Sequence, residues 1–178
     1  MSYIESKSVR STEDRLQRIE DFLEISNLIA THPPIVDSQS FELMVGMFTP
    51  DGVLELAPRG SMMVRERNSA HEDAMHKAAA MGLAHLSTPP YVKLGKNKAV
   101  CFSYAAVTVC DPTADTIAVP AHGAGPGHRL HLIAACSWEI VRTADSSWKV
   151  HRRKLVFCDG SNAPRELQRE VLDAVLVD

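Results

Sequence analysis

The sequence predicts an α+β fold in which N-terminal helices pack on the concave side of a curved antiparallel sheet. Helical periodicity dominates the first third of the chain, and long alternating strands follow between residues 99 and 157. The three long strands succeed one another like a meander. Helices that cover the concave face of such a sheet leave a cone-shaped pocket, which is a common type of small-molecule site.

The N-terminal part of the chain is predicted to form two helices joined by a link with two prolines. Ser11 and Asp14 have the spacing of a helix start, and an apolar stripe continues from there to Ala30. We expect Pro33-Pro34 to end this helix, because proline lacks the backbone N–H and restricts the residue before it. A second helix is expected over 38–47 or 38–48, then a turn at Pro50-Asp51-Gly52 and a strand at 53–56.

The rest of the chain is predicted to be mostly extended. The expected elements are a short helix from about Ser69 to Met81, extended chain over 84–94, strands over 99–110, 128–141 and 148–157, and a short helix after Pro164. Residues 111–127 are rich in glycine and proline and form a loop long enough to suggest a lid or an interface. We divide the chain into a mobile tail (1–12), one domain (13–160) and a C-terminal extension (161–178).

Composition excludes several classes of function. The net charge of −3 provides no basic face for nucleic acid, and no apolar run reaches the roughly 20 residues of a membrane helix. The N-terminus lacks the apolar core of a signal peptide, and the four cysteines form no Cys-x-x-Cys pair. We therefore expect a cytoplasmic protein with free thiols. The spacing of His122, His128 and His131 matches no known ligand set, so we expect neither a metal nor another cofactor.

The order of several short motifs resembles that of SnoaL-like domains, which belong to the nuclear transport factor 2-like superfamily. The resemblance covers residues 13–157. It rests on Glu13-Asp14-Arg15-Leu16, Asp37 followed by Phe41-x-x-Met44, Phe48-x-Pro50-Asp51-Gly52-Val53, Ala84-His85-Leu86-Ser87-Thr88-Pro89, Ser137-Trp138-Glu139 and Ser147-Trp148-Lys149-Val150-His151-Arg152-Arg153.

The resemblance implies a cone-shaped α+β barrel, usually homo-oligomeric, with the active site inside the cone. Lyase branches of the family, such as scytalone dehydratase, bile-acid dehydratase and dehydrochlorinase, use a histidine base oriented by an aspartate. By motif these residues correspond to His85 and Asp37. The bile-acid branch has a tyrosine where this chain has His32, which is a departure, and a second histidine and an asparagine of scytalone dehydratase have no clear match.

Each candidate site residue has a structural alternative. Asp37 precedes a predicted helix and is suited to be its N-cap. His85 is otherwise a core histidine, and His32 a loop histidine rather than a proton donor. Tyr104 and His131 lie on long strands from which they could reach a substrate in the cone, or could take core or surface positions. Of the pair Arg152-Arg153 we expect one exposed and one paired charge.

Two classes of function follow from this interpretation. The first is a cofactor-free lyase or isomerase, similar to a dehydratase, that acts on a small, largely apolar cyclic substrate with His85 as general base and Asp37 as its orienting partner. The second is a non-catalytic ligand-binding or subunit-docking domain of the same superfamily. We also expect a homo-oligomer, dimer or trimer, because the long strands carry apolar residues on both faces and only one face can line the cone.

Overall fold

The computed structural model describes residues 11–57, 60–66 and 69–176, and side chains within 69–71 are not considered. Most of the tail predicted for residues 1–12 lies outside this range. The core of the fold is a curved seven-stranded sheet with the order β2-β1-β9-β8-β5-β3, and β4 also pairs with β5. Its strands are β1 (Phe48–Ala57), β2 (Gly60–Met63), β3 (Ala84–Ser87), β4 (Tyr91–Leu94), β5 (Lys98–Cys110), β8 (His128–Arg142) and β9 (Trp148–Phe157).

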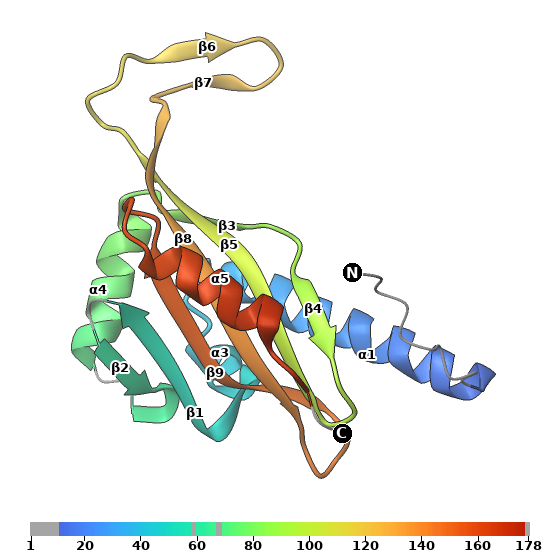
Figure 1. The fold of residues 1–178 in the computed structure, drawn as a ribbon. Coiled ribbons are helices and arrows are strands. Elements are labelled where there is room, and N and C mark those ends of the chain that lie inside the picture. Colours follow the sequence, from blue (N-terminus) through green and yellow to red (C-terminus); the bar gives the residue numbers. More distant parts are fainter. Residues whose placement is uncertain (1–10, 58–59, 67–68, 177–178) are drawn as a thin grey trace.

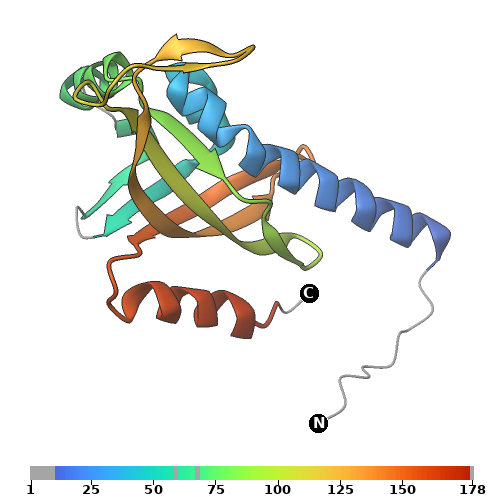
Figure 2. The same cartoon turned by 90° about the horizontal axis from the view of Figure 1, so that it is seen from above.

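Helices cover both faces of this sheet. They are α1 (Thr12–Ala30), α2 (His32–Asp37), α3 (Phe41–Met47), the 3-10 turn η1 (Val64–Glu66), α4 (Ser69–Ala80) and α5 (Ala163–Asp173). The N-terminal helices lie on one side of the sheet and α5 lies on the other (Figures 1 and 2). This is the predicted α+β architecture. One strand pair differs from the antiparallel expectation, because β1 and β9 run parallel.

The link between the first two helices is itself helical. The first helix ends at Ala30 as expected and begins with the predicted capping box of Ser11 and Asp14. Pro33 and Pro34, however, do not interrupt helical structure beyond that point. They occupy the first turn of α2, where the missing N–H would have no partner within the helix. The prolines therefore start a new helix in a new direction.

The second predicted helix begins later than the sequence indicated and ends at Met47, one of the two predicted ends. α3 begins at Phe41, and Phe48, which completes its apolar stripe, is already the first residue of β1. The predicted turn at Pro50-Asp51-Gly52 is absorbed into β1 as an irregularity, visible as a shift of the β1–β9 register between Phe48 and Val53. Phe48 is 3% exposed in the core and pairs with Val150 of β9.

Only the C-terminal half of α1 packs against the sheet. Ile25 and Ile29 are fully buried in the main core with Trp138 and Trp148. In contrast, the apolar side chains between residues 16 and 23 remain more than 40% exposed (Leu16, Ile19, Phe22 and Leu23). The N-terminal part of α1 extends past the edge of the sheet in Figure 2. None of the described helices is both long and apolar enough to cross a membrane.

The outer face of the sheet is covered in part by the chain's own C-terminal helix. Leu167 and Val171 of α5 are buried, and Leu167 packs with Ala135 and Val156 of the sheet. We had expected a second subunit to cover this face. The C-terminal helix takes that role across part of the face, and the homo-oligomer remains a prediction.

The long loop over 111–127 contains a small hairpin that the sequence did not predict. β6 (Ile117–Val119) pairs with β7 (Gly123–Gly125), and the two strands project from the ends of β5 and β8 (Figure 1). Ile117 and Val119 are exposed on it. This hairpin contributes no described side chain to the cavity presented below.

Candidate active site

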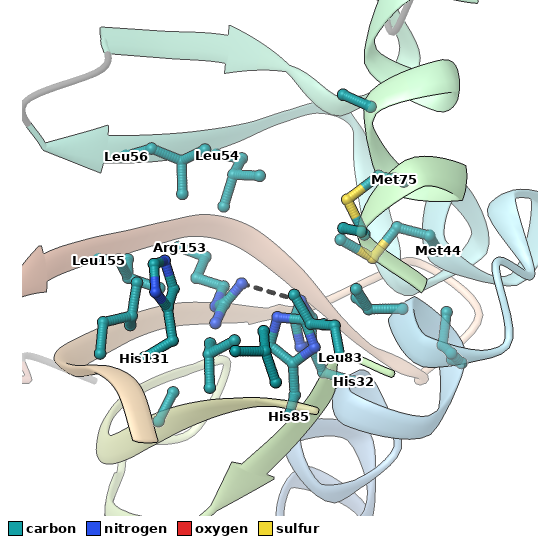
Figure 3. Close-up of a pocket in the computed structure, with 18 of the residues that line it drawn as sticks. His32, Met44, Leu54, Leu56, Met75, Leu83, His85, His131, Arg153 and Leu155 are labelled. Atoms are coloured by element: carbon teal, nitrogen blue, oxygen red, sulfur yellow. Dashed lines mark hydrogen bonds between the residues drawn. The ribbon is translucent and has the colours of Figure 1, made fainter. Parts of the chain in front are cut away.

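An apolar cavity lies between the concave face of the sheet and the helices α2, α3 and α4. Its volume is about 420 Å³, within the usual range of small-molecule sites. Most of its wall is aliphatic or thioether carbon, to which α4 contributes Ala74, Met75 and Ala78 and the turn after it contributes Met81. Figure 3 shows a few polar side chains projecting into this apolar space, namely His32, His85, His131 and Arg153.

Asp37 and His85 are in direct contact at the edge of this cavity, as the sequence predicted. His85 Nδ1 lies 2.5 Å from Asp37 Oδ1, and the backbone N–H of His85 donates to Asp37 Oδ2 at 2.9 Å. Because a carboxylate only accepts hydrogen bonds, Nδ1 donates to Asp37, and in the neutral imidazole Nε2 is the nitrogen without a proton. His85 lines the cavity, and no hydrogen bond within the described residues occupies Nε2.

The turn before β3 determines where His85 points. Gly82 ends the α4 segment with a φ of 66°, and a Cβ on it would lie 2.9 Å from Cβ of Cys110. Only glycine allows this close approach, which places β3 against β5. His85 then pairs with Val107, a residue of the buried face of β5, so its side chain points inward.

Asp37 does not cap a helix, so the structural alternative considered for it is wrong. It is the last residue of α2, and the N-cap position of α3 belongs to Ser40. Both carboxylate oxygens are instead used by His85. Asp37 and His85 retain 26% and 20% side-chain exposure, so the pair is reachable from the cavity without being freely solvated.

The polar centre deeper in the cavity is Arg153, which the sequence analysis did not select. Its side chain is 5% exposed and stacks over Trp138, with 4.6 Å from the guanidinium carbon to the ring centroid. Nη1 donates to His32 Nε2 at 2.8 Å and Nη2 donates to Cys136 Sγ at 3.7 Å, while Nε has no partner. Within the described residues, no carboxylate lies within ion-pair distance of Arg153. A buried guanidinium without a counter-ion is rare, because desolvation of an unpaired charge is costly.

A β-bulge explains why Arg153, and not Arg152, faces inward. Ile140 pairs with Val150 and Glu139 pairs with Arg152, so His151 is an extra residue that shifts side-chain alternation along β9 by one. The expected division into one exposed and one paired arginine is therefore wrong. Arg152 is the exposed one, and it is also the paired one, with Glu55 at 2.6 Å.

His32 lies against Arg153 rather than beside the Asp37–His85 pair. It is 3% exposed, and its ring meets the Trp138 ring edge-on at 5.4 Å. Burial lowers the pKa of His32 well below its ordinary value, and the nearby charges of Arg153 and His85 lower it further. A neutral imidazole that accepts from Arg153 is a poor proton donor. The structure therefore favours a positioning role over the proton donation considered from the sequence.

The two predicted substrate contacts on the strands lie on different sides of the sheet. His131 lines the cavity. Tyr104 instead lies on the outer face, where its hydroxyl accepts from Gln168 Nε2 of α5 at 2.7 Å and its ring contacts Phe102. Tyr104 is thus wrong as a cavity residue, because the odd-numbered residues of β5 are the buried ones.

The part of the chain that the structure describes contains no group of three or more histidine, cysteine, aspartate or glutamate residues able to hold a metal ion. His128 and His131 belong to β8, while His122 lies in the hairpin turn and bonds the Pro120 carbonyl. The chemistry available in the cavity therefore comes from an imidazole with a bare nitrogen, a buried guanidinium and apolar walls.

Solved structures share this fold. The chain aligns with an NTF2-like protein of cystatin-like fold from Novosphingobium aromaticivorans at 25% identity and a TM-score of 0.76, covering 92% of this chain and 98% of that one. It also aligns with ActVI-ORFA from Streptomyces coelicolor (15% identity, TM-score 0.62, 79% and 98% covered). A candidate scytalone dehydratase from N. aromaticivorans gives 15% identity and a TM-score of 0.57, with 83% and 88% covered.

None of the curated proteins compared with the chain matches it. The family comparison is decisive instead, because the SnoaL-like domain family matches residues 17–154, more than half of the chain. The match includes α2, β3 and most of β9, the elements that hold the two polar centres. This chain therefore belongs to the SnoaL-like domain family.

Proposed function

We propose that the protein is a cofactor-free lyase or isomerase, similar to a dehydratase, that acts on a small, largely apolar cyclic substrate. The observation that carries this proposal is the bare Nε2 of His85, held toward an apolar cavity by the two hydrogen bonds to Asp37. Histidine suits proton abstraction near neutral pH with little tuning, and an acid on the opposite nitrogen stabilises the imidazolium that forms.

The reaction we propose begins with a substrate C–H next to a carbonyl. His85 Nε2 takes the proton, and the electron pair of the broken bond moves onto the carbonyl oxygen to give an enolate. In a dehydration, the enolate re-forms the carbonyl and expels a β-hydroxyl, which leaves as water with the proton held by His85. In an isomerisation, the same proton returns to a different carbon. Both routes consume no oxidant or reductant.

Arg153 supports this proposal because the reaction creates negative charge in the cavity. The Arg153 side chain lines the cavity, and no described carboxylate lies within ion-pair distance of it. A preorganised donor of this kind, in a site from which water is excluded, is worth about 100- to 1,000-fold in rate when it meets a developing oxyanion. His32 would position Arg153 without neutralising it, since a buried neutral imidazole accepts one hydrogen bond and adds no charge.

Substitution of the proposed base tests the proposal. A panel of cyclic hydroxy-ketones and polyketide-like compounds, first screened by thermal shift, would supply a substrate. We expect His85→Gln to lower kcat by roughly 100- to 10,000-fold with the fold and ligand binding retained. Asp37→Asn should also lower kcat, because an amide can hold the wrong tautomer. The double variant should lose far less than the product of the two single losses.

His122→Gln is the matched control, because His122 is exposed in the hairpin and lies outside the cavity lining. It should keep wild-type kcat. Wild-type turnover in His85→Gln would reject the catalytic role. Tight binding by every variant, with no turnover of any bound compound, would favour the second candidate function, a non-catalytic ligand-binding domain, which an apolar cavity of this size equally supports.

A further inference from the structure

The titratable side chains that line the cavity share one chemical character. They are all arginine or histidine, and no described aspartate or glutamate is among them (Arg129, Arg153, His32, His85 and His131). Asp37 is the nearest acid to this group that we identify, and both of its oxygens are used by His85. The cavity therefore attracts negative charge and repels positive charge.

The strand register gives the order of these side chains along the cavity. Arg153 pairs with Trp138 of β8, His85 shares a row with Val107 and Leu132, and Arg129 pairs with Val109 nearer the start of β8. Arg153 is 5% exposed, whereas Arg129 and His131 are both exposed. Arg153 therefore marks the closed end, His85 the middle, and Arg129 with His131 the open end.

A second β-bulge turns His131 toward the cavity. Val107 pairs with Leu132 and Thr108 pairs with Leu130, so His131 is the extra residue in β8. Without the bulge, regular alternation with the inward-facing Leu132 would put His131 on the outer face. Bulges that re-aim a side chain are frequent next to active sites. Both bulges described here thus bring a basic side chain into the cavity.

The guanidinium of Arg129 forms no ion pair with the neighbouring acid, within the described residues. Asp111 is the acid nearby, but it accepts from the backbone N–H and the hydroxyl of Thr113, at 3.0 and 2.6 Å. These bonds are the main cause of its lowered pKa, to which Arg129 adds a smaller electrostatic effect. Within the described chain the two side chains form no ion pair. Arg129 is thus available to a ligand at the open end.

We propose that Arg129 and His131 form a carboxylate-binding entrance, so that the substrate is an apolar acid whose carboxylate stays at the open end while its body reaches His85 and Arg153. This inference rests on the proposed function and names the substrate class for the same cavity. The planar fork of arginine matches a carboxylate with two parallel hydrogen bonds. An imidazole N–H beside it can donate a third, whether the ring is neutral or charged.

Binding measurements with an acid and its uncharged isostere test the entrance. The probes are naphthylacetate and naphthylacetamide, titrated calorimetrically into the full chain at neutral pH. We expect the wild type to bind the acid roughly 3- to 10-fold more tightly than the amide, an advantage that shrinks at high salt because the cations are exposed. The double variant Arg129→Gln/His131→Gln should bind the two probes equally, with the amide affinity unchanged.

Two further variants locate the effect and separate it from catalysis. Arg152→Gln removes an arginine that pairs with Glu55 outside the cavity lining, and it should keep the full preference for the acid. His85→Gln should keep it too, because binding requires no turnover, so failure of the catalytic proposal would leave this result intact. Equal binding of both probes by the wild type would overturn the entrance. So would a preference that survives the double variant and disappears in Arg153→Met.

Discussion

The molecule contains two arginine–tryptophan centres that look alike and differ in one component. Arg142 stacks over Trp148 at 4.4 Å and Arg153 stacks over Trp138 at 4.6 Å. Arg142 is paired with the buried Asp21 at 2.5 Å, and Asp21 also accepts from Trp148 Nε1 and Gln17. Among the residues that the structure describes, Arg153 has hydrogen bonds only to His32 and Cys136.

The difference separates a centre that stabilises the fold from the centre that we propose acts on a ligand. Burial alone would raise the pKa of Asp21, but its hydrogen bonds from Arg142, Trp148 and Gln17 outweigh this and lower it, so the carboxylate stays charged and satisfied. This centre joins α1 to the end of β8 and the start of β9, and the charge of its arginine is neutralised by Asp21. The Arg153 centre holds a charge that the protein leaves without a counter-ion, in the wall of a cavity.

The largest effect on folding is expected when the Arg142–Trp148 centre loses its acid, Asp21. Asp21→Ala removes the counter-ion of Arg142 in a mostly buried position and leaves it hydrogen bonds to the Lys96 and Ser146 carbonyls. Removing one member of a buried pair costs roughly 3–5 kcal/mol of unfolding free energy. Denaturant unfolding measures it, with the exposed neighbour Glu20→Ala as control. A loss below about 1 kcal/mol in Asp21→Ala would show that this pair does not hold the helix to the sheet.

The next prediction is that substitution of Arg153, in the centre without an acid, lowers activity much more than stability. Arg153→Met should lower kcat by about 100- to 1,000-fold, because it removes the proposed oxyanion donor. Its unfolding free energy should stay within about 1–2 kcal/mol of wild type, since relief of an unpaired buried charge offsets the lost hydrogen bonds. Arg142→Met is the matched variant and should be much less stable, because it leaves the buried carboxylate of Asp21 without its counter-ion. Equal destabilisation by both arginine substitutions would show that the Arg142 and Arg153 centres contribute equally to stability.

A smaller effect concerns the acid response of His32. Its pKa in the folded protein lies well below the ordinary 6.5, so the unfolded chain binds a proton that the folded chain does not. The stability that depends on this difference is present above pH 6.5 and is lost as the pH falls below it, by at most about 1.4 kcal/mol per pH unit. Unfolding free energies at pH 7.5, 6.5 and 5.5 should therefore fall less steeply in His32→Gln than in wild type. An unchanged slope would contradict a buried neutral His32.

The smallest effect is expected on the face that carries neither centre. Tyr104→Phe removes the hydrogen bond to Gln168 and nothing in the cavity. Because this bond is exposed, the loss should not exceed about 1 kcal/mol of unfolding free energy, with kcat unchanged. Stability and turnover of the purified variant check it. A marked fall in kcat would show that Tyr104 contacts the substrate and that the active site is not the cavity described above.

The sequence predicted the fold and one of the two functional pairs for reasons that remain visible in the structure. Helical and strand periodicity set the layers, and the family resemblance pointed to Asp37 and His85, which do meet. The sequence named His131 as a possible substrate contact but did not select Arg153. The inward orientation of both side chains depends on a bulge, a single extra residue that reverses the faces of a strand. Alternation read from the sequence cannot reveal such a reversal, because the extra residue is defined only by its partner strand.

The misplacement of Tyr104 has a different cause. The sequence divided β5 correctly into two faces, since its odd-numbered residues 99–109 are all buried in the structure. It did not say which face is concave, because α5 also covers the even-numbered face near Phe102. The first half of α1 shows a related limit. Its apolar stripe was visible in the sequence, but its exposure depends on how far the sheet extends beneath it.

The short helix α2 has a consequence for protein engineering. Its first residue, His32, contacts Arg153, and its last, Asp37, contacts His85, so six residues span both halves of the site. These two contacts involve three segments that a transplant to another scaffold would have to hold in register: α2, β3 and the bulged part of β9. The two prolines at the start of α2 would fix its direction in the new host. A graft that rotates this helix would misalign the base and the cation together.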